Sequence, residues 1–153
     1  GRAREALGPA GRIDCAVDWP AGAPRGWALV LHPHPLQGGA RENKVVTTVS
    51  RACVQHGLVA VRPNFRGVGL SEGEFDKSVG ETQDMLAVVA QMRELHPELA
   101  QAPWVLAGFS FGTVILSAAR APVAVSAPIS AVATIAWTAG SVMRVSLRCT
   151  RSM

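Results

Sequence analysis

The sequence predicts an α/β domain in three layers, with a mainly parallel sheet and helices on both faces. The first observation is a set of near-continuous apolar runs, as expected of strands buried on both faces: WALVLH at 27–32, LVAVRPNF at 58–65 and WVLAGF at 104–109. The second is the helical spacing of apolar residues in the segments between them, 41–56 and 81–95. Strands that alternate with helices in this order are typical of parallel sheets, because each crossover must return the chain to the same edge.

Turn residues set the expected boundaries. A short strand is predicted over Ile13–Val17, and His56 with the following glycine ends the first helix. Prolines and glycines make residues 33–39 a loop, and a second, Gly-rich loop is predicted at 66–80.

The first turn of helix 81–95 contains Glu81 and Asp84, where negative charge suits the helix dipole. Asp84 could also reach the loop before it, but a helix-terminal charge is the simpler interpretation. A further helix is expected over residues 112–120, after the third apolar run.

Composition places the chain among single-domain globular proteins. It has 153 residues, of which 48% are hydrophobic and 17% charged, which is enough for one packed core. Cys15, Cys53 and Cys149 form no zinc or disulfide pattern, so we expect a reducing cytoplasm, with inert thiols at Cys15 and Cys53. The start of the chain has no apolar stretch typical of a signal peptide.

The net charge of +4 comes entirely from the end of the chain. Residues 111–153 contain no acid and these basic residues: Arg120, Arg144, Arg148 and Arg151. Residues 1–110 therefore hold 11 basic and 11 acidic side chains, because the whole chain has 15 and 11. No basic stripe with interleaved aromatics runs through that part, so nucleic acid is not an expected partner.

The candidate chemistry lies in a G-x-S-x-G pentapeptide, Gly108-Phe109-Ser110-Phe111-Gly112. It follows an apolar strand and precedes a helical pattern, the setting in which this spacing presents a serine nucleophile on a tight turn. Gly108 and Gly112 leave room at the elbow, and the backbone N–H of Phe111 is a candidate oxyanion donor. The alternative is an ordinary strand–helix junction with Ser110 as a helix cap.

A second oxyanion donor is expected from the loop after the strand at 27–32. Pro33 and Pro35 have no N–H, so His34 is the first choice and Leu36 the alternative. The side chains of His32 and His34 are expected to fix this loop by local hydrogen bonds. They could also be a metal pair, but the spacing supplies no third ligand, so no metal is predicted.

The G-x-G at 67–69 suggests a dinucleotide site, but it lies in a loop rather than opening a helix. We therefore expect that loop to line the mouth of the active site, and no cofactor is predicted.

Several motifs in order resemble those of a bacterial α/β-hydrolase family close to the dienelactone hydrolases and short-chain peptidase-like hydrolases. They are LHPHPLQGG, NKVV, RPNFRGVGLSEGEF, VGETQDM and LAGFSFG, and the resemblance covers residues 8–119. It implies the α/β-hydrolase fold and hydrolysis of an ester, lactone or similar acyl bond without a cofactor. Dienelactone hydrolases carry cysteine at the nucleophile position, where this chain has Ser110.

The chain departs from this family after Ser110. Family members place an acid and then a histidine after the nucleophile, whereas no Asp, Glu or His follows Ser110 here. His56 and His96 precede it, on or after helices, and are not expected to act as the base. We therefore expect a fold truncated after the nucleophile-elbow helix, with an N-terminal hydrolase part at 1–120.

Residues 121–153 form an atypical tail rich in Ala, Ser, Val and Arg, without helix or strand periodicity. Our hypothesis is that a frame shift replaced the native segment. Two alternatives remain: residues 121–143 as a weak membrane segment, although Pro122 and Pro128 interrupt it, or a native terminal strand and helix.

The predicted function is therefore that of a serine hydrolase acting through Ser110 on a small-molecule acyl substrate. Activity of the chain by itself is doubtful, because the acid and histidine of the triad are missing from it. The alternatives are a non-catalytic binding protein on the same fold, or a half-enzyme that a partner chain complements. The sequence predicts no membrane association and leaves the oligomeric state open.

Overall fold

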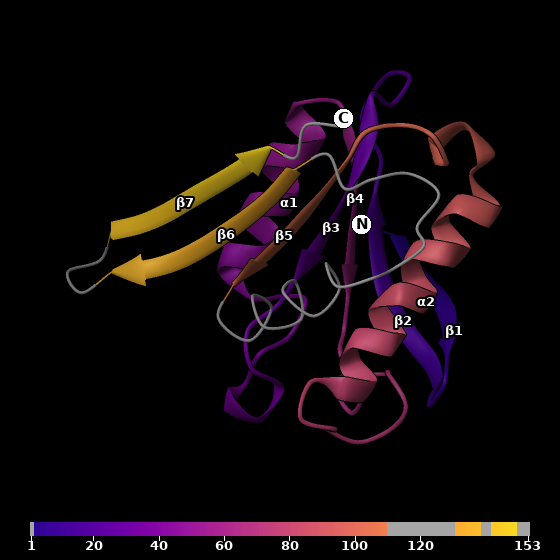
Figure 1. Cartoon of the computed structure of the whole chain (residues 1–153), viewed down its shortest axis with the longest axis vertical. Helices are drawn as coiled ribbons and strands as arrows, with labels where there is room; N and C mark the ends of the chain where they lie inside the picture. The colour runs from indigo at the N-terminus through magenta and orange to yellow at the C-terminus, as the bar shows by residue number, and fades with distance from the viewer. Residues whose placement is uncertain (1, 110–130, 139–141, 150–153) are drawn as a thin grey trace.

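The structure is a computed structural model that describes residues 2–109, 131–138 and 142–149. Within them, seven strands form one sheet in the order β1-β2-β4-β3-β5-β6-β7 (Figure 1). The strands are β1 (Arg2–Gly8), β2 (Gly11–Asp18), β3 (Gly26–Leu31), β4 (Leu58–Pro63), β5 (Trp104–Phe109), β6 (Ala131–Thr138) and β7 (Val142–Cys149). The helices are α1 (Lys44–Gln55) and α2 (Val79–Leu95), with short 3-10 turns η1 (Pro35–Gln37) and η2 (Pro97–Leu99).

The centre of the sheet is parallel and its edges are antiparallel. β4, β3, β5 and β6 run in the same direction, as the sequence predicts from the strand–helix alternation. β1 pairs antiparallel with β2, β2 with β4, and β7 with β6. The carboxyl ends of the four parallel strands therefore meet at one edge of the sheet.

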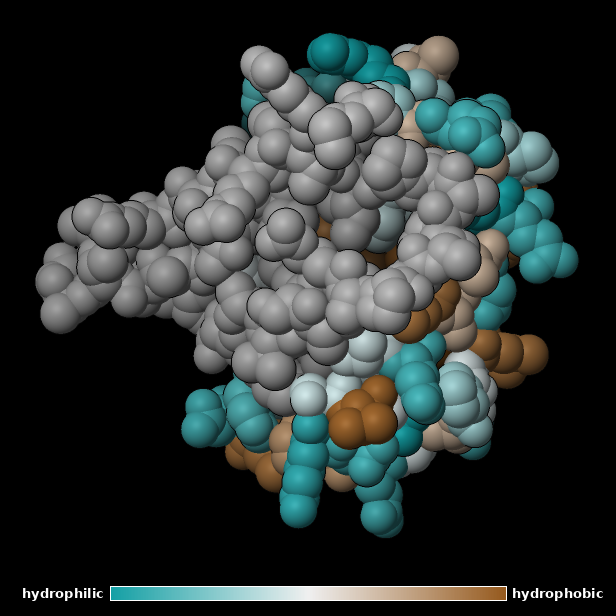
Figure 2. All heavy atoms as spheres, viewed as in Figure 1, coloured by the Kyte–Doolittle hydropathy of each residue, from teal (hydrophilic) through white to brown (hydrophobic). Residues whose placement is uncertain are grey.

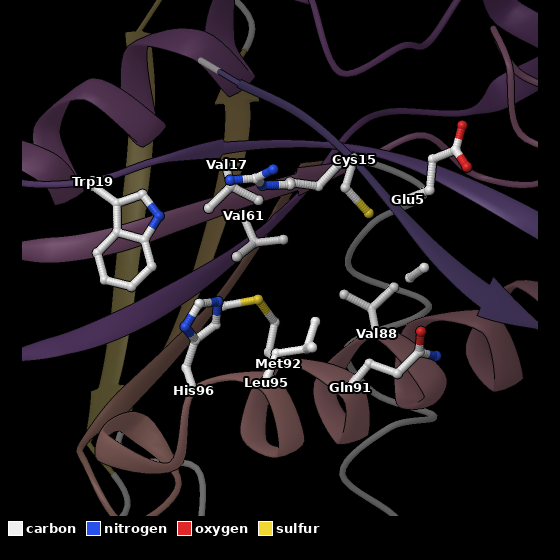
Figure 3. A pocket seen from close by; sticks show the side chains of 12 residues that line it. Glu5, Cys15, Val17, Trp19, Val61, Val88, Gln91, Met92, Leu95 and His96 are labelled. Atoms are coloured by element: carbon white, nitrogen blue, oxygen red, sulfur yellow. The ribbon is translucent and has the colours of Figure 1, made fainter.

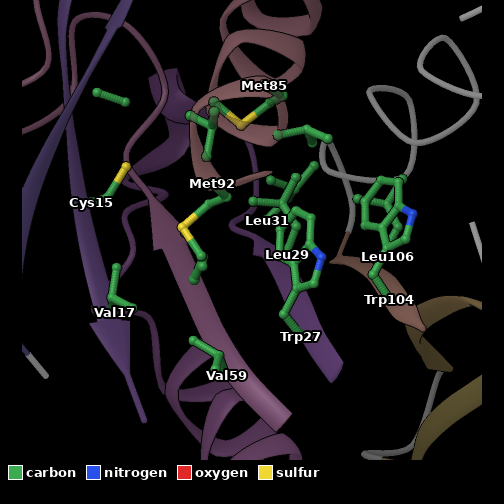
Figure 4. Packing of buried hydrophobic residues seen from close by; sticks show 14 of the residues in the cluster. Cys15, Val17, Trp27, Leu29, Leu31, Val59, Met85, Met92, Trp104 and Leu106 are labelled. Atoms are coloured by element: carbon green, nitrogen blue, oxygen red, sulfur yellow. The ribbon is translucent and has the colours of Figure 1, made fainter. Parts of the chain in front are cut away.

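α1 and α2 cover opposite faces of the sheet, which confirms the expected three layers. Alternate side chains of β3 separate the two sides: Leu29 belongs to the core cluster that includes Met85 of α2, and Val30 to the cluster that includes Val46 of α1. The α2 side holds the larger core (Figure 4). There the indoles of Trp27 and Trp104 stack, with centroids 4.9 Å apart and planes at 8°.

Helix capping explains where the helices begin. The Asn43 side chain accepts a hydrogen bond from the Val45 N–H at 3.0 Å, so α1 begins at Lys44 rather than at residue 41. At α2, the Ser78 N–H donates to Glu81 Oε1 at 3.1 Å. This contact belongs to a capping box, and α2 begins two residues before the expected start.

The structure contains strands that the main sequence predictions did not include. β1 was not predicted, because only Ala6 of its seven residues is buried and edge strands carry little apolar signal. The tail has no strand periodicity in its sequence, yet β6 and β7 lie within it, in line with the terminal strand that was one of the alternatives. β6 gains its ladder by pairing with β5, so partner strands override a weak local pattern. The predicted helix 112–120 lies outside the described residues.

No helix in the described part of the chain is long and apolar enough to cross a membrane. Of the segment 121–143, which the sequence analysis considered as a membrane span, residues 131–138 form β6. Residues 121–130 lie outside the described part.

Candidate active site at the carboxyl edge of the sheet

The loops that follow β3, β4 and β5 leave the sheet at the same edge. Leu31, the last residue of β3, is paired with Gly108 of β5, and Gly108 is paired on its other side with Thr134 of β6. Gly108, the first glycine of the G-x-S-x-G motif, thus lies near the end of a strand with parallel neighbours on both sides. In open α/β sheets this edge is where ligands bind. Ser110, Phe111 and Gly112 lie outside the described residues.

His32 joins the loop after β3 to the loop after β4. Its ring is fully buried, and Nε2 accepts a hydrogen bond from the Phe65 N–H at 3.0 Å. Nδ1 lies 2.7 Å from the Pro33 carbonyl oxygen, to which it donates in the neutral tautomer. Burial lowers the pKa of His32 to about 4, so the ring is neutral at pH 7. This confirms the expected local role of His32.

His34 organises the loop that carries the candidate oxyanion donor. Its Nδ1 accepts a hydrogen bond from the Leu36 N–H at 3.1 Å, and its carbonyl oxygen accepts from the N–H groups of Gln37 and Gly39. The ring also contacts Phe75 of the next loop, with centroids 5.0 Å apart. The Leu36 N–H, the alternative donor from the sequence, is therefore occupied within the loop.

A buried polar network, which the sequence analysis did not predict, holds the far end of this loop. The Arg41 N–H donates to Asn64 Oδ1 at 2.9 Å, and Asn64 Nδ2 donates to Asp14 Oδ2 at 3.2 Å. The Arg41 guanidinium lies 3.3 Å from the same Asp14 carboxylate. Arg62 Nη1 donates to the Arg41 carbonyl at 2.8 Å. The loops after β3 and β4 are thus bound to each other and to β2.

Ser71 extends this network into the Gly-rich loop. Its Oγ accepts a hydrogen bond from the Asp14 N–H at 2.9 Å and donates to the Asn64 carbonyl at 2.8 Å. The Gly-rich loop lies beside the loop of His34 (Figure 1). Its expected place at the mouth of the active site stays a prediction.

The start of α2 is fastened to the same loop by an ion pair. Arg66 Nε donates to Asp84 Oδ2 at 2.7 Å, and Arg66 Nη2 donates to Asp84 Oδ1 at 2.9 Å. The hydrogen bond to Asp84 is the main cause that raises the pKa of Arg66. Asp84 is 1% exposed. The simpler interpretation of Asp84 as only a helix-terminal charge was therefore wrong, because the carboxylate also binds the preceding loop.

The remaining histidines lie at the opposite edge of the sheet. His56 caps the end of α1, two residues before β4 begins, and His96 caps the end of α2. His96 contacts Trp19 with ring centroids 5.0 Å apart, and its Nδ1 lies 3.6 Å from Glu98 Oε1. Both rings thus lie away from the carboxyl edge, and the expectation that neither serves as the base stays a prediction.

Together these contacts connect the loops at this edge through neutral His32 and through the carboxylates of Asp14 and Asp84, each of which faces a guanidinium. Such an arrangement suits a site that works through oriented backbone N–H groups. Among the described residues, no group of three or more His, Cys, Asp or Glu is arranged to hold a metal ion.

Comparisons with known proteins agree with this architecture. The sequence profile of the X-Pro dipeptidyl-peptidase (S15) family matches residues 12–148. The chain is 44% identical over 108 residues to an uncharacterised protein of Rickettsia prowazekii (strain Madrid E). The aligned part covers 71% of this chain and 44% of that protein.

Solved structures give the same result. An α/β serine hydrolase homologue from Coxiella burnetii is 40% identical with a TM-score of 0.70, covering 75% of this chain and 54% of that one. A lidless α/β serine hydrolase from Xanthomonas campestris is 41% identical with a TM-score of 0.73, covering 78% and 55%. The chain thus spans about half the length of these relatives. It has the α/β-hydrolase fold and belongs to the X-Pro dipeptidyl-peptidase (S15) family.

Proposed function

We propose that this chain carries the nucleophile part of a serine hydrolase that cleaves an ester, lactone or similar acyl bond through Ser110. The observation that carries the proposal is the place of the G-x-S-x-G motif. Its first glycine, Gly108, is the penultimate residue of β5, between two parallel strands. That setting is the one in which such a turn raises a serine above the sheet. The proposed reaction needs no cofactor and no metal.

The proposed roles follow from this geometry. Ser110 attacks the acyl carbon, while the N–H groups of Phe111 and His34 donate to the developing oxyanion. Gly108 and Gly112 are the small residues of the elbow. The choice of His34 is supported by the loop itself, because its ring already occupies the Leu36 N–H.

An apolar acyl group suits the surface around this edge. Leu36 in the loop after β3 is 71% exposed and Leu70 in the loop after β4 is 64% exposed. Figure 2 shows hydrophobic atoms among hydrophilic ones at the lower end of the molecule, where Figure 1 places these loops. Exposed leucines on loops around a site favour substrates with an apolar portion.

The base and acid of the proposed reaction are not assigned. No Asp, Glu or His follows Ser110 within the 153 residues, which span about half the length of the relatives. The described histidines are engaged in the loop contacts or lie at the other edge. A half-enzyme complemented by a partner chain and a non-catalytic acyl-binding protein are the alternatives to a serine hydrolase.

We propose a cytoplasmic location, supported by the thiols of Cys15 and Cys53, which are free. Burial raises the pKa of Cys15 to about 12, so this thiol is inert, as the sequence analysis expected.

The boundary at residue 120 and the frame-shift hypothesis for the tail stay predictions. Sequencing the coding DNA beyond the codon of Ser110 tests both, because an intact frame would contradict the hypothesis.

A fluorophosphonate probe tests the proposal directly. The purified chain is incubated with the probe to label its serine. Separate samples measure turnover of p-nitrophenyl butyrate, an ester, and of Gly-Pro-p-nitroanilide, which tests the activity for which the family is named. We expect label on Ser110, lost in Ser110→Ala and kept in the matched control Ser117→Ala. Labelling without turnover favours the half-enzyme. A folded chain that takes no label contradicts the proposal and favours the binding protein.

A further inference from the structure

A cavity of about 430 Å³ lies between α2 and the strands β1, β2 and β4 (Figure 3). Its floor is apolar and is formed by buried side chains from all of these elements: Ala6, Cys15, Val17, Val61, Val88 and Met92. The volume lies within the range of about 300–1,000 Å³ that is usual for small-molecule sites. The thiol of Cys15 is neutral at pH 7, because burial raises its pKa to about 12, and so adds no charge to the floor.

One end of the cavity lies at the amino edge of the parallel strands, away from the carboxyl edge where the candidate active site lies. β2 is antiparallel to β4, and Asp18 at its end is paired with Ala60 near the start of β4. Trp19 and His96, which line the mouth, therefore lie at the amino edge. Figure 3 shows both rings on the same side of the hollow, with Met92 and Val61 beside them.

Large apolar side chains are left in contact with solvent at this mouth. Trp19 is 41% exposed and Leu95 is 70% exposed, although both line the cavity. Exposed aromatic and aliphatic side chains above an apolar floor would gain free energy by covering an apolar ligand. The chain thus offers an apolar site that its own described residues do not fill.

The polar groups of the cavity favour an anionic head group. Among the described residues, no hydrogen bond or ion pair of the structure involves the Arg4 guanidinium, which also lines the cavity. The charge of Glu5 is offset by Arg12 Nη1 at 4.0 Å. Gln91 is neutral, and its amide is occupied by the backbone of Leu7, at 2.9 Å as acceptor and 2.7 Å as donor.

We propose that this cavity binds a carboxylate with an apolar chain, with the chain over the floor and the carboxylate on Arg4. The charge of Arg4 selects the head group, and the apolar floor selects the tail. The site requires neither Ser110 nor the proposed acyl chemistry, so it can be tested whether or not the chain is a hydrolase.

The experiment titrates the full chain with sodium decanoate, below its micelle concentration, and follows binding by calorimetry. Decanol and decyltrimethylammonium serve as the neutral and cationic probes. We expect decanoate to bind most tightly. Arg4→Met should weaken decanoate about fivefold and leave decanol unchanged, because it removes one partly solvated ion pair and keeps the apolar stem. Arg2→Met, an exposed arginine of the same strand that does not line the cavity, is the matched control.

Val88→Phe fills the floor and should abolish binding of both decanoate and decanol, provided that its near-ultraviolet circular dichroism stays native. The proposal is overturned if the wild-type chain does not bind decanoate, or if Arg4→Met and Arg2→Met bind it equally well. It is also overturned if folded Val88→Phe keeps the wild-type affinity, because the ligand would then bind elsewhere.

Discussion

The imidazole of His32 and the backbone of Phe65 are joined by a hydrogen bond of 3.0 Å between Nε2 and the amide nitrogen. Their rings also meet edge to face, with centroids 4.5 Å apart. His32 follows β3, whereas Phe65 follows β4, so one buried neutral ring holds two loops of the candidate active site. Protonation of His32 would place a second proton where Nε2 now accepts, and the bond to Phe65 would be lost.

The free energy of unfolding should therefore decrease as the pH is lowered through the range set by the pKa of His32. Burial lowers the pKa of His32 in the folded state to about 4, below its ordinary value of 6.5. Between these two pKa values, the unfolded chain binds more protons than the folded chain does. The stabilising contribution of neutral His32 is therefore complete above pH 6.5 and is lost as the pH falls toward 4. At pH 5 the expected loss is about 2 kcal/mol. Urea unfolding at pH 7.5 and pH 5 measures it in the wild type and in His32→Gln, whose dependence on pH should be smaller by this amount. Equal dependence in both proteins would contradict the assignment.

Asn64 is expected to be the most sensitive polar residue of the loop network. It accepts from the Arg41 N–H and donates to the Asp14 carboxylate, and it is 5% exposed. Asn64→Ala leaves both partners short of a hydrogen bond and should lower the free energy of unfolding by about 2 kcal/mol. Asn64→Asp should be worse at pH 7, because it sets a second carboxylate against Asp14. Urea unfolding gives the order, and an aspartate variant as stable as the wild type would refute it.

The pair Arg66–Asp84 should show the strong asymmetry of a buried ion pair. Arg66→Met leaves the Asp84 carboxylate, 1% exposed, without its cation, and should cost about 3 kcal/mol. The double variant with Asp84→Leu removes the stranded charge and should recover part of that loss. Arg51→Met on the exposed side of α1 is the control and should change stability by less than about 0.5 kcal/mol. A double variant less stable than Arg66→Met would contradict this account.

The central strands could be predicted from the sequence because their side chains are buried on both faces. β3 reads GWALVL with every residue buried, so its apolar run is continuous. β1 reads RAREALG and has one buried residue, so its local pattern carries no such signal. It is a strand because β2 supplies its backbone partners along its whole length.

The candidate site was predictable only where its chemistry lies in local motifs. The loop of His34 follows from its prolines and glycines. The elbow, which the spacing of Gly108 and Gly112 indicates, stays a prediction because residues 110–112 lie outside the described part of the chain. The bonds of Asp14 to Arg41 and Asn64 join residues 27 and 50 positions apart, and no periodicity encodes such contacts. Only the register of β2 against β4, which pairs Cys15 with Pro63, brings Asp14 beside Asn64.

Gly38 and Gly39 give the sharpest test of the loop that carries His34. A Cβ at Gly39 would collide with the Pro33 carbonyl oxygen and lie 2.7 Å from the His34 carbonyl oxygen, and both are backbone atoms. Gly39→Ala should therefore move the loop and cost about 1–3 kcal/mol. At Gly38 a Cβ meets nothing within 4 Å, and only the positive φ of 77° opposes a side chain. Gly38→Ala should thus cost about 1 kcal/mol without displacing His34.

Urea unfolding measures both costs, and fluorophosphonate labelling of Ser110 reports on the oxyanion site. Under the proposed function, Gly39→Ala should label far more slowly than Gly38→Ala. Equal labelling by two folded variants would remove His34 from the oxyanion site but leave Ser110 as the proposed nucleophile.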